Sequence, residues 1–203
     1  GQGGSLFVYP LTANVVVHGV HLPVNFPASG PTFEMHYDQM GWLGAMTNAQ
    51  QQGGVGRLQA NNIGSPPFDA TYRGGKLYSA THQPNGSFSL ARLLEVDVSA
   101  WPLLSLAWLD YSGGSTWYFW PAATANAFGD VGLVFSHSDA SRFASARWAV
   151  KPADAAFVLA SGQLEAGLGY HGTYPDSAQH LFRWGDYAGA AVDPVDQGLW
   201  LYD

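Results

Sequence analysis

The stretch that decides the fold is Arg183-Trp184-Gly185-Asp186-Tyr187, followed by Ala191-Val192-Asp193-Pro194 and Gly198-Leu199-Trp200-Leu201-Tyr202. Its pattern predicts a tight polar turn, a short strand, an Asp-Pro turn and a second strand rich in aromatic side chains. Residues 125–136 and 71–81 repeat this order of turn and strand. A unit that recurs along a chain is typical of a β-propeller or a solenoid. The sequence therefore predicts a repeated β architecture.

The composition also favours an all-β protein. Only 11% of the 203 residues are charged, whereas 14% are aromatic, and the chain contains 25 Gly and 12 Pro. Low charge combined with many Gly, Pro and aromatic residues is typical of short strands joined by tight turns. The hydrophobic fraction of 47% is large enough to form a substantial core. We expect residues 1–203 to form a single β domain, or a segment of a longer propeller.

Charge and cysteine content exclude several classes of function. The net charge is −7, and the eight Lys and Arg residues are scattered, so no basic surface is predicted for nucleic acid. No run of about 18 apolar residues is present, so we expect no membrane span. The chain contains no Cys, which excludes disulfides, thiol catalysis and cysteine-based zinc sites. The absence of Cys is also common among exported bacterial β proteins.

Strand-like segments occupy most of the chain, and only residues 153–156 suggest a helical turn. Between residues 93 and 98, Leu94, Val96 and Val98 alternate with acidic side chains, which is typical of a half-buried strand. The turn-and-strand units are unevenly spaced. A propeller blade takes roughly 40–50 residues, so the chain has room for about four blades. A β-sandwich would produce a similar list of strands and is the alternative architecture.

Three segments resemble secreted bacterial proteins of the sialidase-like, BNR-repeat (Asp-box) β-propeller superfamily. Residues 182–188, with 192–194 and 199–202, are similar to a signature of that superfamily. Residues 126–136 are similar to its repeated strand, and residues 75–82 and 93–98 fit its strand order. The resemblance covers roughly residues 66–203. It implies a β-propeller and an extracellular or cell-surface location in a bacterium.

The sequence departs from this superfamily at two points. The Asp-box pattern is present only as Asp110-Tyr111-Ser112-Gly113-Gly114-Ser115-Thr116-Trp117, in which Ser and Asp are exchanged. In addition, such propellers usually continue beyond the final aromatic strand. Because an open sheet edge favours aggregation, we expect either that residues 6–17 close the ring or that the chain is part of a longer array.

The candidate catalytic residues are Glu34 and Asp38, which lie in the segment with the densest mixture of acid, base and phenol groups. Glycoside hydrolysis requires two carboxylates about 5–9.5 Å apart, and Asp97 with Asp110 is an alternative pair. Sialidases also hold the substrate carboxylate with several arginines. None of the six Arg residues matches that set. Arg183 is a candidate ligand-binding residue, although anchoring the turn at residues 183–187 is the favoured role.

Three histidines follow short strands after glycine-rich turns: His82, His137 and His171. If they occupy equivalent blade positions, they would line a central channel and bind a ligand or a transition metal. The alternative, which the sequence favours, is that each caps a strand end by hydrogen bonding to the backbone.

Two further sets of side chains are candidates for binding. Asp193 and Asp196 lie in the C-terminal turns and are candidate ligands of Ca²⁺, although the sequence favours the alternative that these aspartates hydrogen bond to turn backbones. Trp42 and Trp101 stand beside turns and are candidate platforms for sugar rings. The remaining large aromatics are expected in the core, packed between sheets. They include Trp108, Trp117, Tyr118, Trp120, Trp148, Trp184 and Trp200.

The sequence therefore predicts a secreted, non-catalytic β-propeller module that binds a glycan or a surface protein through loops on one face. The first alternative is a sialidase-like glycoside hydrolase. The second is a structural subunit of a surface assembly, in which an unpaired edge strand docks on another chain.

Overall fold

A computed structural model describes most of the chain. Its backbone is described at residues 4–11, 14–21, 34–39, 47–53, 56–60, 69–97, 105–156, 160–172, 175–176, 181–185 and 188–203. Side chains are described at residues 47–53, 56–60, 69–97, 111–156, 160–172, 181–185 and 188–203. Every element in these ranges is a strand, which confirms the all-β prediction. The described residues contain no helix able to cross a membrane.

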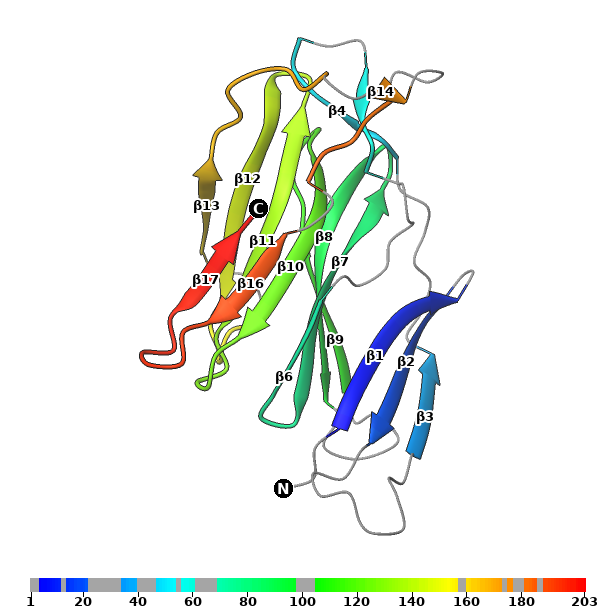
Figure 1. Cartoon of the computed structure of the whole chain (residues 1–203), viewed down its shortest axis with the longest axis vertical. Coiled ribbons are helices and arrows are strands. Elements are labelled where there is room, and N and C mark those ends of the chain that lie inside the picture. The colour runs from blue at the N-terminus through cyan, green and yellow to red at the C-terminus, as the bar shows by residue number, and fades with distance from the viewer. Residues whose placement is uncertain are drawn as a thin grey trace.

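Two antiparallel meanders of four strands form the body of the molecule (Figure 1). The first comprises β6 (Ala70–Arg73), β7 (Lys76–Asn85), β8 (Phe88–Asp97) and β9 (Ser105–Tyr111). The second comprises β10 (Trp117–Ala125), β11 (Val131–Asp139), β12 (Arg142–Lys151) and β13 (Ala160–Glu165). In each meander the strands pair in chain order.

Three smaller sheets complete the described structure. They are an antiparallel sheet of β1 (Gly4–Leu11), β2 (Asn14–His21) and β3 (Glu34–Gln39), and a hairpin of β16 (Gly189–Val192) and β17 (Leu199–Tyr202). The last is a short sheet in the order β14 (Pro175–Asp176), β15 (Leu181–Phe182), β5 (Arg57–Leu58) and β4 (Ala49–Gln50). Its parallel β15–β5 pair joins segments far apart in the sequence.

Glycine sets the turns of the first meander. Gly74 and Gly75 both have positive φ, at 59° and 81°, and they form the two-residue connection between β6 and β7. Such a turn twists in the same sense as the strands that flank it, and glycine adopts it without steric cost. This turn fixes the register of β6 against β7, so Tyr72 pairs with Leu77.

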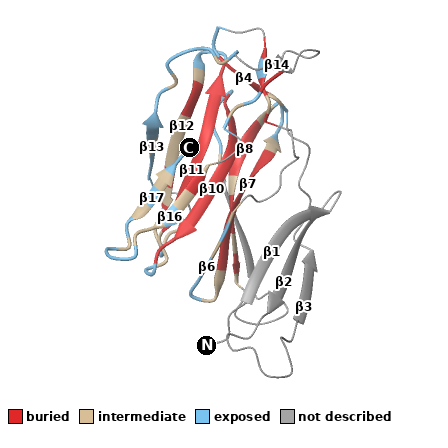
Figure 2. Ribbon diagram, viewed as in Figure 1, coloured by how far each residue is buried: buried red, intermediate tan, exposed pale blue. Residues whose placement is uncertain are grey.

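The second meander is the central layer of three. All nine residues of β10 and all nine of β11 are buried (Figure 2). On one side, β10 lies against β7 and β8, and Tyr78 and Leu93 pack with Phe135 in a common core. On the other side, β16 lies against β10 and β17 against β11. Strands covered on both faces carry continuous runs of apolar residues, which explains the lack of alternation in β10.

The layers therefore follow one another in chain order, from β6–β9 through β10–β13 to the β16–β17 hairpin. Among the described residues, no sheet closes into a ring. The helical turn expected at residues 153–156 does not form. The backbone N–H of Ala155 instead donates to the carbonyl oxygen of Pro152 at 3.0 Å, which makes a β-turn.

Candidate ligand-binding site

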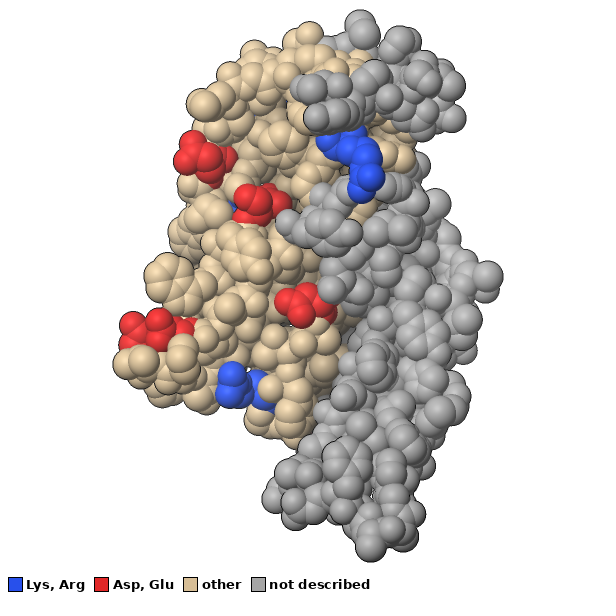
Figure 3. All heavy atoms as spheres, viewed as in Figure 1, with Lys and Arg blue, Asp and Glu red and all other residues tan. Residues whose placement is uncertain are grey.

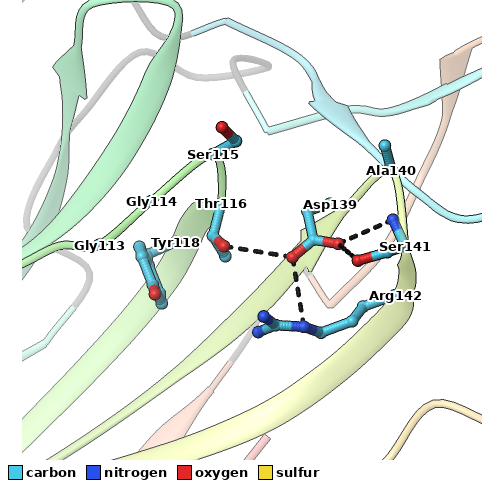
Figure 4. A pocket seen from close by; sticks show the side chains of 9 residues that line it. All are labelled: Gly113, Gly114, Ser115, Thr116, Tyr118, Asp139, Ala140, Ser141 and Arg142. Carbon is cyan, nitrogen blue, oxygen red and sulfur yellow. Dashed lines mark hydrogen bonds and ion pairs between the residues drawn. The ribbon is translucent and has the colours of Figure 1, made fainter.

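An open pocket of about 410 Å³ lies where the β9–β10 loop meets the β11–β12 hairpin (Figure 4). The β9–β10 loop comprises residues 112–116. The pocket is lined by Gly113, Gly114, Ser115, Thr116, Tyr118, Asp139, Ala140, Ser141 and Arg142. Its walls thus combine peptide groups, hydroxyls, one carboxylate and one guanidinium.

Asp139, the last residue of β11, organises the pocket. Its Oδ1 accepts hydrogen bonds from the backbone N–H of Ser141 at 2.8 Å and from the Ser141 hydroxyl at 2.7 Å. Its Oδ2 accepts the Thr116 hydroxyl at 3.2 Å and pairs with Arg142 Nε at 3.3 Å. Burial alone would raise the pKa of Asp139, but the Ser141 hydrogen bonds and the Arg142 charge hold it below its usual value. Asp139 is therefore an ionised anchor.

Arg142 supplies the positive charge of the pocket. Its side chain is 51% exposed, and Asp139 engages its Nε edge. A guanidinium carries five N–H donors in a planar fork, so the two terminal nitrogens project beyond this ion pair, as Figure 4 shows. A group held in place at one edge and half-exposed is suited to bind a carboxylate or a hydroxyl-rich ligand.

The local sequence explains the shape of the β9–β10 loop. Gly114 has a φ of 55°, a backbone conformation that residues other than glycine rarely adopt. At Gly113, an added Cβ would lie 3.6 Å from the Tyr118 hydroxyl oxygen, so the loop packs beside this hydroxyl at ordinary contact distance. Thr116 then fixes the end of the loop through its bond to Asp139.

Tyr118 lines the pocket and stacks on His137, with ring centroids 6.2 Å apart and planes 17° from parallel. His137 itself is fully buried. Its Nδ1 lies 3.1 Å from the Ser145 carbonyl oxygen, so Nδ1 carries the proton of the neutral ring. Burial lowers the pKa of His137 to about 4, and the charges of Arg147 and Arg142 act in the same direction. His137 is therefore a neutral supporting residue at pH 7.

The other two candidate histidines lie in separate environments. His82 is fully buried, and its Nδ1 accepts the backbone N–H of Trp120 at 3.0 Å. His171 exchanges two backbone hydrogen bonds with the Gln51 side chain, and its ring contacts Phe182 and Trp184. Within the described part of the chain, no three His, Asp or Glu side chains are grouped so as to hold a metal ion.

The C-terminal aspartates stabilise the turn between β16 and β17. Asp193 Oδ1 accepts the backbone N–H of Val195 at 2.8 Å, and Asp196 Oδ1 accepts that of Gly198 at 2.7 Å. Asp193 Oδ2 also accepts the indole N–H of Trp200 at 3.2 Å. These bonds use the carboxylates in the way that aspartate commonly stabilises turns. Arg183, the remaining candidate for ligand binding, directly follows β15. It is exposed and interacts with another group of the protein.

The remaining candidates lie wholly or partly outside the described side chains. Glu34 and Asp38 belong to β3, where only the backbone is described, paired with His21 and Val17. The side chain of Asp110, in the alternative pair with Asp97, is likewise outside the described set. Trp42 and Trp101 lie outside the described residues altogether.

Sequence reasoning missed the pocket and misjudged one aromatic residue. The sequence pattern drew attention to the β9–β10 loop but not to Asp139 and Arg142, which complete the pocket. The sequence feature that could have indicated these two residues is a polar turn between two apolar strands. Trp117, Tyr118 and Trp120 are buried, as predicted, whereas Trp148 and Trp184 are half-buried, and the side chain of Trp108 lies outside the described set. The prediction was wrong for Trp200, which is 65% exposed because its strand belongs to the outermost sheet.

Comparisons with known proteins do not extend this picture. No protein-family model matches the chain, and neither the curated proteins nor the solved structures compared with it provide a match.

Proposed function

We propose that the chain is a non-catalytic, β-propeller-type module, exported to the surface of a bacterium, which binds a glycan or a protein through loops at one end of its sheets. The stacking of the sheets supports the propeller component. Successive four-stranded meanders that pack face to face in chain order are the arrangement of successive blades. The β16–β17 hairpin would then belong to a third blade.

The single observation that carries the binding component is the pocket between the β9–β10 loop and the β11–β12 hairpin. Loops at the ends of rigid strands are where binding residues concentrate. The half-exposed Arg142 can donate two parallel hydrogen bonds to a carboxylate, and the hydroxyls and peptide groups around it suit sugar hydroxyls. An acidic glycan, or an acidic side chain of a partner protein, matches this lining.

The chemistry of Asp139 favours binding over hydrolysis. It is the one carboxylate among the residues that line the pocket. A glycosidase requires a pair, with the acid member protonated near neutral pH. Asp139 has a lowered pKa and is engaged by Ser141, Thr116 and Arg142. It is therefore poorly suited to be a general acid.

Calorimetric titration with 3′-sialyllactose and with lactose tests the proposal. We expect the sialylated sugar to bind and Arg142→Ala to weaken it about tenfold, which is the usual cost of losing a charged hydrogen bond. Arg73→Ala, an exposed arginine on β6, is the matched control and should bind normally. Parallel assays with an aryl sialoside should show no turnover. Turnover that is lost in Glu34→Gln would instead establish the hydrolase alternative.

A further inference from the structure

The outer face of the β16–β17 hairpin carries two large aromatic side chains. Leu199 and Leu201 point inward, where their methyl groups would lie 3.1 Å from a Cβ added at Gly132 of β11. Because side chains alternate along a strand, Trp200 and Tyr202 share the opposite face. They are 65% and 64% exposed. Figure 3 shows this side of the molecule, where the surface over β16 and β17 is mainly uncharged, with acidic side chains near its margins.

Both rings are held in position by the neighbouring strand. Tyr202 pairs with Gly189, and its ring occupies the space that a Cβ at Gly189 would take. The ring therefore lies across the strand rather than standing away from the sheet. Trp200 pairs with Ala191, another small residue, and its indole N–H donates to Asp193 Oδ2 at 3.2 Å. Two flat rings, about 7 Å apart along the strand, are thus oriented before any ligand arrives.

We propose that Trp200 and Tyr202 form a stacking platform for a neutral oligosaccharide. One face of a pyranose ring consists mainly of C–H groups, which bury apolar surface when laid on an aromatic ring. The hydroxyls at the sugar's edge then reach the surrounding polar groups. This second surface lies on a sheet face and uses none of the pocket residues. The proposed platform can therefore be tested independently of the proposed pocket.

The charges at its margin select a neutral ligand. Asp193 and Asp196 stand at the turn beside Trp200. Hydrogen bonds from the backbone N–H of Val195 and the indole of Trp200 hold the pKa of Asp193 below its usual value, so it is ionised at neutral pH. Ionised carboxylates accept hydrogen bonds from sugar hydroxyls and repel anionic glycans.

The size of the platform argues against a second copy as the occupant. Large aromatic side chains present roughly 150–250 Å² each, so two rings exposed by about two-thirds offer roughly 200–330 Å². A stable protein interface needs about 800 Å² from each partner. Two adjacent rings instead match two or three sugar units.

Titration of the full chain with cellohexaose, mannohexaose and chitohexaose, monitored by calorimetry and by saturation-transfer NMR, tests the platform. We expect at least one of these sugars to bind at micromolar to millimolar concentration. Trp200→Ala and Tyr202→Ala should each weaken it about tenfold. Tyr72→Ala on β6 is the matched control, since that ring is 63% exposed on a different sheet and should not matter.

Gly189→Val tests whether sugar binding depends on the position of the Tyr202 ring or only on the presence of exposed apolar side chains. It retains both aromatic residues but displaces the Tyr202 ring, so we expect a similar loss of sugar binding with the chain still folded. Arg142→Ala should leave this binding unchanged, which distinguishes the platform from the pocket. The proposal is overturned if none of the three sugars binds, or if Tyr72→Ala is as harmful as Trp200→Ala. Saturable binding of choline, without binding of any sugar, would show that the rings recognise a cation and would overturn the proposal. Self-association that Trp200→Ala abolishes would show that a second copy occupies the surface, and would also overturn it.

Discussion

The Nδ1 atom of His82 accepts the backbone N–H of Trp120 at 3.0 Å, and this bond joins two different sheets. His82 lies on β7, whereas Trp120 lies in β10 at an irregularity in its pairing with β11. Trp120 has a φ of 52°, which is rare for a bulky residue and persists only where the surroundings impose it. The rings also meet edge to face, with centroids 5.1 Å apart. His82 thus stabilises the bend of the central strand.

Replacing His82 should reveal this role. We expect His82→Ala to lower the free energy of unfolding by about 2–4 kcal/mol, because it removes a buried acceptor and leaves a cavity beside Trp120. Urea unfolding followed by tryptophan fluorescence measures the change. The control is Gln83→Leu on the same strand. Gln83 is buried, and within the described part of the chain its Nε2 finds no partner. That substitution should be neutral or stabilising, and an equal loss in both variants would contradict the assignment.

A second link between the sheets is the ion-pair cluster around Glu95. Glu95 on β8 binds Lys76 of β7 through Oε1 and Lys151 of β12 through Oε2, the latter at 3.2 Å. Burial would raise the pKa of Glu95, but hydrogen bonds from Lys76 and Lys151 hold it below its ordinary value. The stabilisation is therefore present above the unfolded-state pKa and is lost as the pH falls through the lower folded-state pKa.

Glu95→Gln should lower the free energy of unfolding by about 3 kcal/mol at pH 7, because it leaves the buried Lys151 ammonium without its counter-charge. Glu165→Gln on the exposed strand β13 is the matched control and should change stability by less than about 0.5 kcal/mol. Denaturant titrations at pH 7 and pH 3 measure both. The difference between wild type and Glu95→Gln should shrink at pH 3, and an unchanged difference would refute the charge-based explanation.

The packing of the hairpin on the central layer leads to a third prediction. A Cβ at Gly132 would lie 3.1 Å from the methyl groups of Leu199 and Leu201. Gly132→Val should therefore displace the β16–β17 hairpin and lower the unfolding free energy by about 1–3 kcal/mol. Hydrogen exchange should accelerate at residues 189–192 and 199–202. Gly169→Ala is the control, since a Cβ there meets nothing within 4 Å. Unchanged exchange in the hairpin would show that these contacts do not hold it.

Local signals in the sequence were sufficient for some individual strands. The aromatic run at residues 199–202 coincides with β17, and the alternation that ends at Val96 and Asp97 matches the buried and half-buried sides of β8. Periodicity reports the environment of one strand at a time. It could not show that β10 lies against β7 and β8, because that contact depends on how two sheets pack.

The same limit applies to the sites. Asp139 and Arg142 are ordinary turn residues in the sequence, and only the approach of the β9–β10 loop makes them part of a pocket. Trp200 has the pattern of a core residue because it alternates with Leu199 and Leu201. Which face of such a strand is covered depends on what lies beside it, and the outer face of this hairpin is exposed.

The last prediction concerns Asp203, whose carboxylate joins β17 to the central layer. The Ser136 hydroxyl donates to its Oδ2 at 2.6 Å, and the Trp184 indole N–H donates to that serine oxygen at 3.1 Å. Asp203 as a whole residue is exposed, but the loss of water around its carboxylate raises the pKa of Asp203 to about 6, against an ordinary value of 3.8, with the Ser136 hydrogen bond acting in the opposite direction.

A raised pKa means that the folded state holds this proton more tightly than the unfolded chain. The contribution of Asp203 to stability is therefore complete below about pH 4 and declines as the pH rises through about 6. Asp203→Asn keeps an acceptor for Ser136 and removes the ionisation. We expect this variant to have a higher melting temperature than wild type at pH 7.5 and a similar one at pH 4. Calorimetric scans across this range measure the difference. A variant less stable than wild type at both pH values would mean that the ionised carboxylate itself stabilises β17.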